Sequence, residues 1–132
     1  MLFNTDLLNK RIPNILDNAP LETIIKSKNP ESFKVEMLLR SFKLGNIPNL
    51  DEIALIFDVS RRTLERNLNN EGSNFSMIKQ KFVQQKSIEM LQFQSLTIKE
   101  VSENLNYSNS QNFIRSFKKW TGKTPIEYRD ML

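Results

Sequence analysis

The sequence predicts an all-α protein that contains two copies of one helix-turn-helix pattern. Three observations support this prediction. Apolar residues recur at helical spacing along most of the chain, Ser, Thr and Asn precede those stripes as helix-start residues, and no segment shows the alternation expected of a strand. The pattern of residues 49–70 also returns in residues 97–120. This repetition strengthens the prediction, because a single helical hairpin is common in all-α cores.

The segment 1–29 carries the fewest structural signals. Pro13 and Pro20 interrupt its short apolar stretches. We therefore expect residues 1–29 to form an N-terminal extension, or the remnant of a preceding domain, with one short helix near Leu21. The main domain is expected to comprise residues 30–132.

The main domain is predicted to open with a helix that begins at Asn29-Pro30-Glu31 and ends near Lys43. Asn29 can cap the helix, Pro30 suits its first position, and Glu31 favours its positive end. The core face of this helix is predicted to carry Phe33, Met37 and Leu38.

The first motif, residues 49–70, is predicted to consist of two short helices joined by a tight turn. Asn49 and Glu52 have the spacing of a capping box at the first helix. Ser60 is a good N-cap for the second helix, because its hydroxyl can accept from free amides there. The apolar faces are Ile53, Ala54 and Phe57 in the first helix and Leu64 and Leu68 in the second.

The longest predicted helix follows, over residues 75–93, and separates the two motifs. Residues 97–120, the second motif, then repeat the first motif with one inserted residue. Capping pairs are expected at Thr97–Glu100 and Ser108–Gln111, and Asn106 suits a positive φ in the turn. Gly122 is expected to end the second motif. Thr124 and Glu127 then form a capping box that opens a short last helix, with Pro125 at its first position.

Charge and composition limit the classes of function. The net charge is +4 and the sequence pI is about 9.4. Residues 1–59 hold 7 basic and 8 acidic side chains, whereas residues 60–132 hold 12 basic and 7 acidic ones. This asymmetry favours a polyanionic partner, although a basic surface kept for solubility explains charge alone equally well. The absence of Cys and His removes nearly all zinc sites, thiol chemistry and serine triads, and we expect no cofactor.

Two short helices with a basic outer face on the second describe a helix-turn-helix that binds DNA. No apolar run has the length of a membrane span and no signal-peptide pattern opens the chain, so we expect a cytoplasmic protein without a membrane partner. The central helix of ~18 residues would span ~27 Å. That length makes insertion of two recognition helices into successive major grooves, ~34 Å apart, feasible.

Residues 105–129 resemble the signature of AraC/XylS-family DNA-binding domains. The resemblance rests on Asn106-Tyr107, Phe113-Ile114-Arg115-Ser116-Phe117-Lys118, Gly122 with Pro125, and Tyr128-Arg129. The segments 60–68 and 71–75 add to it. Asn106 stands where the family usually has glycine, and Asp58 where glycine is frequent. The resemblance implies a homeodomain-like tandem that binds double-stranded DNA sequence-specifically, as part of a bacterial transcription regulator.

The same resemblance offers an interpretation of the N-terminus. Residues 3–13 look like the tail of the effector-sensing domain that precedes the DNA-binding domain in one subgroup. The chain would then be a C-terminal fragment, and we prefer this interpretation to the alternative, in which Met1 is a true start followed by a private extension. A small-molecule effector would act only through the missing sensing domain. We expect this chain to be monomeric, and the full-length protein could be a dimer.

In the first motif, base readout is assigned to the exposed start of the second helix. We expect Arg62, Glu65 and Arg66 to contact bases, and Arg61 and Thr63 to contact phosphates or bases. By resemblance, Arg62, Glu65 and Arg66 align with the family's base-contacting positions. Glu65 has an alternative role, in which it only pairs with Arg61 or Arg62 and restrains them.

In the second motif, the corresponding face carries Ser110, Gln111, Ile114 and Arg115. Arg115 matches Arg66 in the repeat, and Gln111 could read adenine or instead serve in capping. Lys118 is expected to contact phosphates, which set affinity but carry no direct sequence information. Because this face is less charged, we expect the second motif to contribute less specificity.

Three alternatives compete with DNA reading. A helical protein-interaction module, for example one that contacts RNA polymerase, would not need direct base readout. An enzyme would need a converging set of catalytic groups, and the carboxylates are explained by helix capping instead. Binding of single strands would need exposed aromatic rings, but the helical spacing of Tyr107, Phe113, Phe117 and Trp120 predicts a core.

Overall fold

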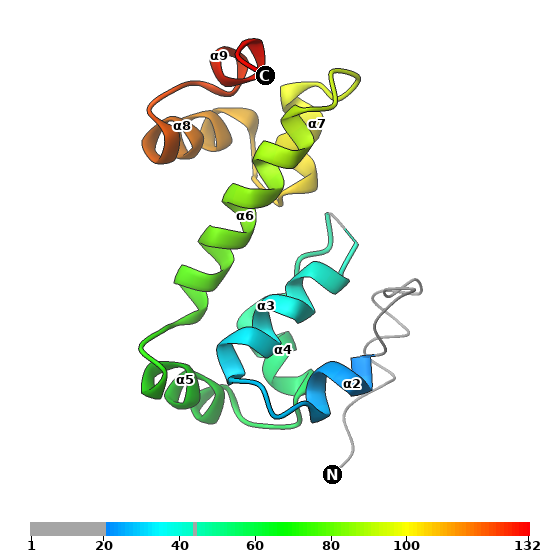
Figure 1. The fold of residues 1–132 in the computed structure, drawn as a ribbon, viewed down its shortest axis with the longest axis vertical. Coiled ribbons are helices and arrows are strands. Elements are labelled where there is room, and N and C mark those ends of the chain that lie inside the picture. Colours follow the sequence, from blue (N-terminus) through cyan, green and yellow to red (C-terminus); the bar gives the residue numbers. More distant parts are fainter. Residues whose placement is uncertain (1–20, 44) are drawn as a thin grey trace. The chain divides into compact units, whose positions relative to one another are not determined.

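The computed structural model of this chain describes residues 21–43 and 45–132, and the interpretation of residues 1–20 lies outside them. Throughout the described residues the secondary structure is helical and no strand occurs, which confirms the all-α prediction (Figure 1). The helices are α2 (Leu21–Lys26), α3 (Glu31–Ser41), α4 (Leu50–Ile56), α5 (Arg61–Asn70), α6 (Phe75–Leu91), α7 (Ile98–Asn104), α8 (Ser110–Thr121) and α9 (Pro125–Asp130). The chain divides into two compact units, Met1–Phe82 and Val83–Leu132.

The core of the first unit is formed by α3, α4 and α5. Helix α5 is the recognition helix of the first motif. Helix α3 packs against α2 and α5, and α4 packs against α5. The buried side chains are Val35, Leu38, Leu39 and Phe42 from α3 and its C-cap, Ile53, Ile56 and Phe57 from α4 and its C-cap, and Leu64 and Leu68 from α5. The prediction that Phe33 belongs to this core face is wrong. Phe33 is 44% exposed, because the buried stripe of α3 runs through positions 35, 38, 39 and 42.

The sequence predicted that Asn29 caps the start of α3, and this prediction is wrong. A carboxylate that is distant in the sequence caps the helix instead. Pro30 occupies the N-cap position and makes no side-chain cap. Glu71, at the C-cap of α5, accepts hydrogen bonds from the amides of Glu31 (2.7 Å) and Ser32 (2.9 Å). The Ser32 hydroxyl adds a third bond at 2.6 Å. Partial burial raises the pKa of the Glu71 carboxyl, but these hydrogen bonds lower that pKa more, so that it lies below its ordinary value.

The core of the second unit is built around two buried aromatic rings of α8. Phe113 and Phe117 are fully buried, together with Leu91 and Val101. Tyr107 lies against Phe113, with ring centroids 5.4 Å apart, and Trp120 lies against Phe117. This arrangement bears out the core role predicted for the aromatic cluster.

The short helix α9 contacts α8 through Tyr128, whose ring meets Phe117 edge-on at 5.4 Å. Arg129 ties α9 to a second element, the C-terminal end of α6. Its guanidinium donates to the carbonyls of Leu91 (2.9 Å) and Phe93 (3.3 Å), at the C-terminal end of α6. A cation is favoured there, because the last carbonyls of a helix have no partner within it.

Candidate nucleic-acid interface

The first motif places its recognition helix, α5, after a tight turn that the sequence predicted closely. Asp58 has a φ of 57°, in the left-handed region that Asp tolerates better than most residues. Ser60 caps α5 by accepting from the amide of Thr63 at 3.0 Å, as expected. The Ser60 hydroxyl also donates to the Thr63 hydroxyl at 2.9 Å. Thr63, a predicted DNA contact, is thus half-buried and engaged within the cap.

The outer face of α5 presents two arginines that the protein leaves available. Arg62 and Arg66 are both exposed. No hydrogen bond or ion pair to either guanidinium is formed by any residue in 21–43 or 45–132. Residues four apart on a helix share one face, so both side chains can meet the same ligand surface. Each carries five donors in a planar fork, the geometry that pairs with guanine edges and with phosphate.

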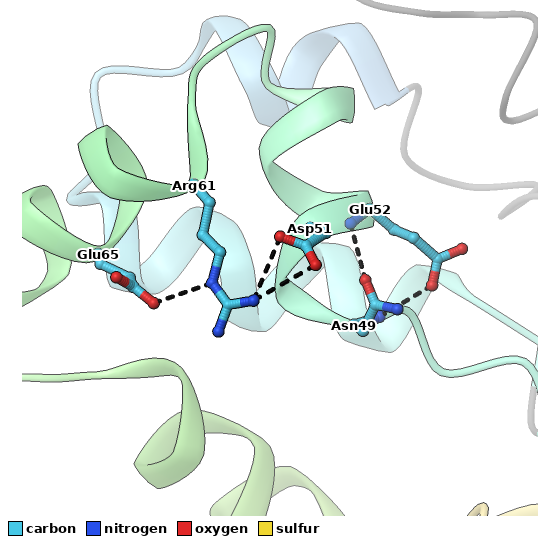
Figure 2. Close-up of polar contacts among 5 residues, drawn as sticks. All are labelled: Asn49, Asp51, Glu52, Arg61 and Glu65. Carbon is cyan, nitrogen blue, oxygen red and sulfur yellow. Dashed lines mark hydrogen bonds and ion pairs between the residues drawn. The ribbon is translucent and has the colours of Figure 1, made fainter.

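Arg61 differs from these two arginines because two carboxylates hold it. Its Nε donates to Glu65 Oε1 at 3.1 Å, and its Nη1 lies 3.3 Å from both oxygens of Asp51 (Figure 2). The hydrogen bond to Glu65 and the charges of Asp51 and Glu65 raise the pKa of Arg61. Glu65 therefore makes the restraining pair that the sequence left open. Asp51 was missed, because nothing in the sequence connects it with a residue ten positions later on another helix.

The first turn of α4, on which Asp51 stands, is itself fixed. The Asn49 side chain accepts from the Glu52 amide at 2.8 Å, and the Glu52 carboxylate accepts from the Asn49 amide at 3.1 Å. This is the capping box predicted from the sequence, and Figure 2 shows it beside the Asp51–Arg61 contact. The backbone that carries Asp51 is thus held by bonds that do not involve Arg61.

The second motif starts its recognition helix, α8, one residue later than predicted. Asn109, not Ser108, is the N-cap, and it accepts from the amide of Asn112 at 2.8 Å. The residue inserted relative to the first motif displaces the cap. Ser108 instead accepts from the Asn112 side-chain amide at 2.9 Å. Gln111 is therefore not part of a capping pair, and its side chain is exposed in the first turn of α8.

The outer face of α8 is more polar and less charged than that of α5. Arg115 is exposed, but it donates to the Asn112 side-chain oxygen, so it is tethered to its own helix. Gln111 and Lys118 are exposed, whereas Ser110 and Ile114 are half-buried. The two buried rings beneath this face leave no aromatic platform for stacked bases at Phe113 or Phe117.

The remaining helix starts follow the predicted signals. Thr97 accepts from the Glu100 amide at 3.1 Å, which is one half of the expected capping box. Asn106 has a φ of 65°, and Gly122 ends α8 with a φ of 80°. The predicted box of Thr124 with Glu127 is complete, and Pro125 follows the cap.

The described part of the chain offers neither a metal-binding cluster nor a membrane-spanning helix. It contains no group of three or more His, Cys, Asp or Glu side chains placed to hold a metal ion. None of its helices is both long enough and apolar enough to cross a membrane. The arginine-bearing face of α5 and the polar face of α8 thus remain the features that suit a ligand.

Comparison with known proteins agrees with this geometry. A family model described as a helix-turn-helix domain matches residues 53–131. The ornithine utilization regulator of Pseudomonas aeruginosa is 31% identical over 86 residues, which cover 65% of this chain and 25% of that protein. The transcriptional regulator CdpR of the same organism superposes with a TM-score of 0.71 and 28% identity, over 76% of this chain and 31% of that one.

A third similar protein supports the fold. A transcriptional regulator of Chromobacterium violaceum, described by its AraC-type DNA-binding domain, has a TM-score of 0.67 and 24% identity, over 76% of this chain and 90% of that chain. The chain thus spans 25% and 31% of the lengths of the two Pseudomonas regulators, but 90% of the Chromobacterium violaceum chain.

Proposed function

Because this chain belongs to the AraC-type helix-turn-helix family of transcription regulators, whose domains bind specific DNA sequences, we propose that it reads double-stranded DNA with α5 and α8. Each recognition helix enters a major groove, and the two grooves are successive. The observation that carries this proposal is the pair of guanidiniums of Arg62 and Arg66 on the outer face of α5, which are exposed and bound by none of the residues that the structure describes.

In the first motif, Arg62 and Arg66 supply base readout. A guanidinium can bind the O6 and N7 atoms of guanine together. Glu65 keeps one carboxylate oxygen free of the Arg61 bond, which can accept from a cytosine amine. Thr63 lies beside these contacts and touches the phosphate backbone or a base edge, after release of part of its bonds within the cap.

In the second motif, Gln111 and Arg115 read bases and Lys118 binds phosphate. The half-buried Ser110 and Ile114 shape the contact at the helix start. Arg115 must release Asn112 before it can bind a base, whereas Arg66 has no bond to release within residues 21–43 and 45–132. We therefore assign the larger share of specificity to the first motif.

We assign the reading function to residues 30–132, and residues 1–29 are an N-terminal extension or the remnant of a preceding domain. An effector, if the whole protein has one, acts through a sensing domain outside this chain. Contact with RNA polymerase is an added role of the exposed surface. The protein acts in the cytoplasm, where bacterial DNA lies. This chain by itself binds DNA as a monomer.

The test is selection of bound sequences from a randomised duplex pool at physiological salt, followed by sequencing. The expected result is an enriched motif with two halves centred ~10 bp apart. Affinity for the selected duplex should fall steeply and linearly on a double-logarithmic salt plot, because phosphate contacts release counterions. A folded chain that enriches no sequence would contradict the proposal.

Two variants then connect each half of the motif with one helix. Arg66→Ala should blur one half and Arg115→Ala the other. Lys99→Ala, which removes an exposed cation of α7, should leave both halves sharp. If the chain is instead a protein-interaction module, all three variants should keep their binding to the protein partner. This result would favour the protein-interaction function over DNA reading.

A further inference from the structure

A series of three charged side chains connects α4 with the recognition helix α5. It runs from Asp51 through Arg61 to Glu65, which contacts a base in the function proposed above. Asp51 holds the Nη1 atom of Arg61, and the Nε atom of Arg61 holds Glu65 (Figure 2). The three side chains are 47% to 66% exposed. They line one open hollow of 590 Å³ at α4, α5 and the first residues of α6. All three side chains of the series, including Glu65, are thus accessible to a ligand.

The geometry of a guanidinium makes this series directional. Arg61 is planar and rigid, so its Nε and Nη1 donors cannot be aimed independently of each other. When Asp51 fixes Nη1, the plane of the guanidinium is set, and with it the position of the Glu65 oxygen that Nε binds. Asp51 in turn stands on a helix turn that the Asn49–Glu52 capping box holds. The position of the Glu65 carboxylate is therefore set from α4.

We propose that Asp51 is a specificity-determining positioning residue, which acts through Arg61 to hold the Glu65 carboxylate at the base that it reads. This inference rests on the proposed DNA-reading function. It gives Arg61 a role inside the protein in place of a direct DNA contact. It also extends the readout of the first motif to α4, beyond the recognition helix.

A simpler effect of Asp51 would be general repulsion of DNA by one negative charge. That effect would weaken binding to every sequence alike and would not depend on Arg61. Asp58 provides the matched control. It is an exposed aspartate of the same motif, and Asn is tolerated at its positive φ. Asp58→Asn therefore removes the same charge without touching the series.

The experiment measures base preference with the selected duplex and its three single-base variants at each position. Glu65→Gln first identifies the base pair that Glu65 reads, as the position at which preference is lost. Asp51→Asn should lower preference at that same base pair by about twofold to fivefold, a size typical of coupled exposed charges, and at no other. Asp58→Asn should leave that preference unchanged. Circular dichroism and thermal melting confirm that each variant is folded.

A double-mutant cycle separates action through Arg61 from action by charge. Arg61→Gln should lower the same preference, and adding Asp51→Asn to it should change nothing further. Rescue by Arg61→Lys should fail, because an ammonium lacks the two fixed donors. These results together support the inference.

Three results would overturn it. In the first, Asp51→Asn leaves the preference at the Glu65 position intact. In the second, Asp58→Asn lowers the preference as much as Asp51→Asn does, or Asp51→Asn still lowers the preference when it is added to Arg61→Gln, which indicates a charge effect alone. In the third, Glu65→Gln changes no preference in a chain whose wild type selects a clear sequence. If the wild type selects no sequence at all, the proposed function fails as well, so the two failures are distinguishable.

Discussion

The two motifs share one topology but hold their recognition helices in different ways. Helix α5 has two buried side chains, Leu64 and Leu68, and its start is braced by the ion pairs of Arg61. Helix α8 buries two phenylalanine rings, and Tyr107, Trp120 and Tyr128 pack around them.

The difference teaches where each motif is vulnerable. Exposed ion pairs contribute little stability and are weakened by salt, whereas a buried aromatic ring contributes several kcal/mol. Substitutions on the exposed surface of the first motif should therefore change recognition more than folding. In the second motif, substitutions in the aromatic core should change folding first.

The largest expected effect is removal of a ring from the second motif. Phe113→Ala should lower the free energy of unfolding by about 3–5 kcal/mol, because it leaves a cavity in a fully buried site. Urea denaturation followed by circular dichroism measures this loss. Phe93→Ala, at a ring that is 61% exposed, is the control and should change stability little. Equal effects of both substitutions would contradict the comparison.

The next effect concerns DNA affinity. Here we expect the larger loss from a substitution in the first motif, whereas the larger loss of stability is expected in the second. Arg66→Ala should weaken binding to the selected duplex by about 1–3 kcal/mol, and Arg115→Ala by less. The physical reason is that Arg115 exchanges its bond with Asn112 for a base contact, whereas Arg66 makes a new one. Fluorescence titration of a labelled duplex measures both. A larger loss for Arg115→Ala would reverse the assignment of specificity.

A smaller effect, equal in the two motifs, is expected at the helix caps. Ser60→Ala and Asn109→Ala should each lower the free energy of unfolding by about 1 kcal/mol. Ser108→Ala is the matched control, because Ser108 accepts only from a side-chain amide. Thermal melting distinguishes these cases. If Ser108→Ala proved as harmful as Asn109→Ala, the cap would lie where the sequence first suggested it.

The smallest effect is a pH dependence of the contact between Glu71 and the start of α3 in the first unit. Glu71 binds the amides of α3 as a carboxylate, and its pKa is lowered from 4.5. Its contribution to stability is therefore present above pH 4.5 and is lost as the pH falls through the lowered pKa. At neutral pH, Glu71→Gln should lower the free energy of unfolding by a few tenths of a kcal/mol to about 1 kcal/mol, since the site is exposed.

Denaturation at several pH values tests this expectation. The difference between wild type and Glu71→Gln should shrink as the pH drops below 4.5. Glu103→Gln, at an exposed position of α7, is the control and should give a small difference at every pH. A Glu71→Gln difference that grew on acidification would have the wrong sign for this carboxylate.

The features that sequence reasoning predicted well are local. Ser60, the Asn49–Glu52 pair and the Thr124–Glu127 pair act within four residues of where they stand, so their spacing is sufficient to identify them. The exposed arginines Arg62 and Arg66 follow from the apolar stripe that α5 buries, because the remaining positions must face outwards.

The features that it missed depend on contacts between helices or on register. The predicted cap at Asn29 is replaced by Glu71, which lies 40 residues from the Glu31 amide that it binds. Asp51 meets Arg61 only after α4 and α5 have packed together. No periodicity within one helix carries such information, because it arises from the tertiary arrangement.

The bond between Glu71 and α3 has a practical consequence for hybrid regulators. The family match begins at residue 53, inside α4. A graft cut at that point would discard Asp51, the Asn49 cap and the two α3 amides that Glu71 binds. The donor segment should instead be cut ahead of Pro30, so that the end of the recognition helix brings its own anchor into the new host.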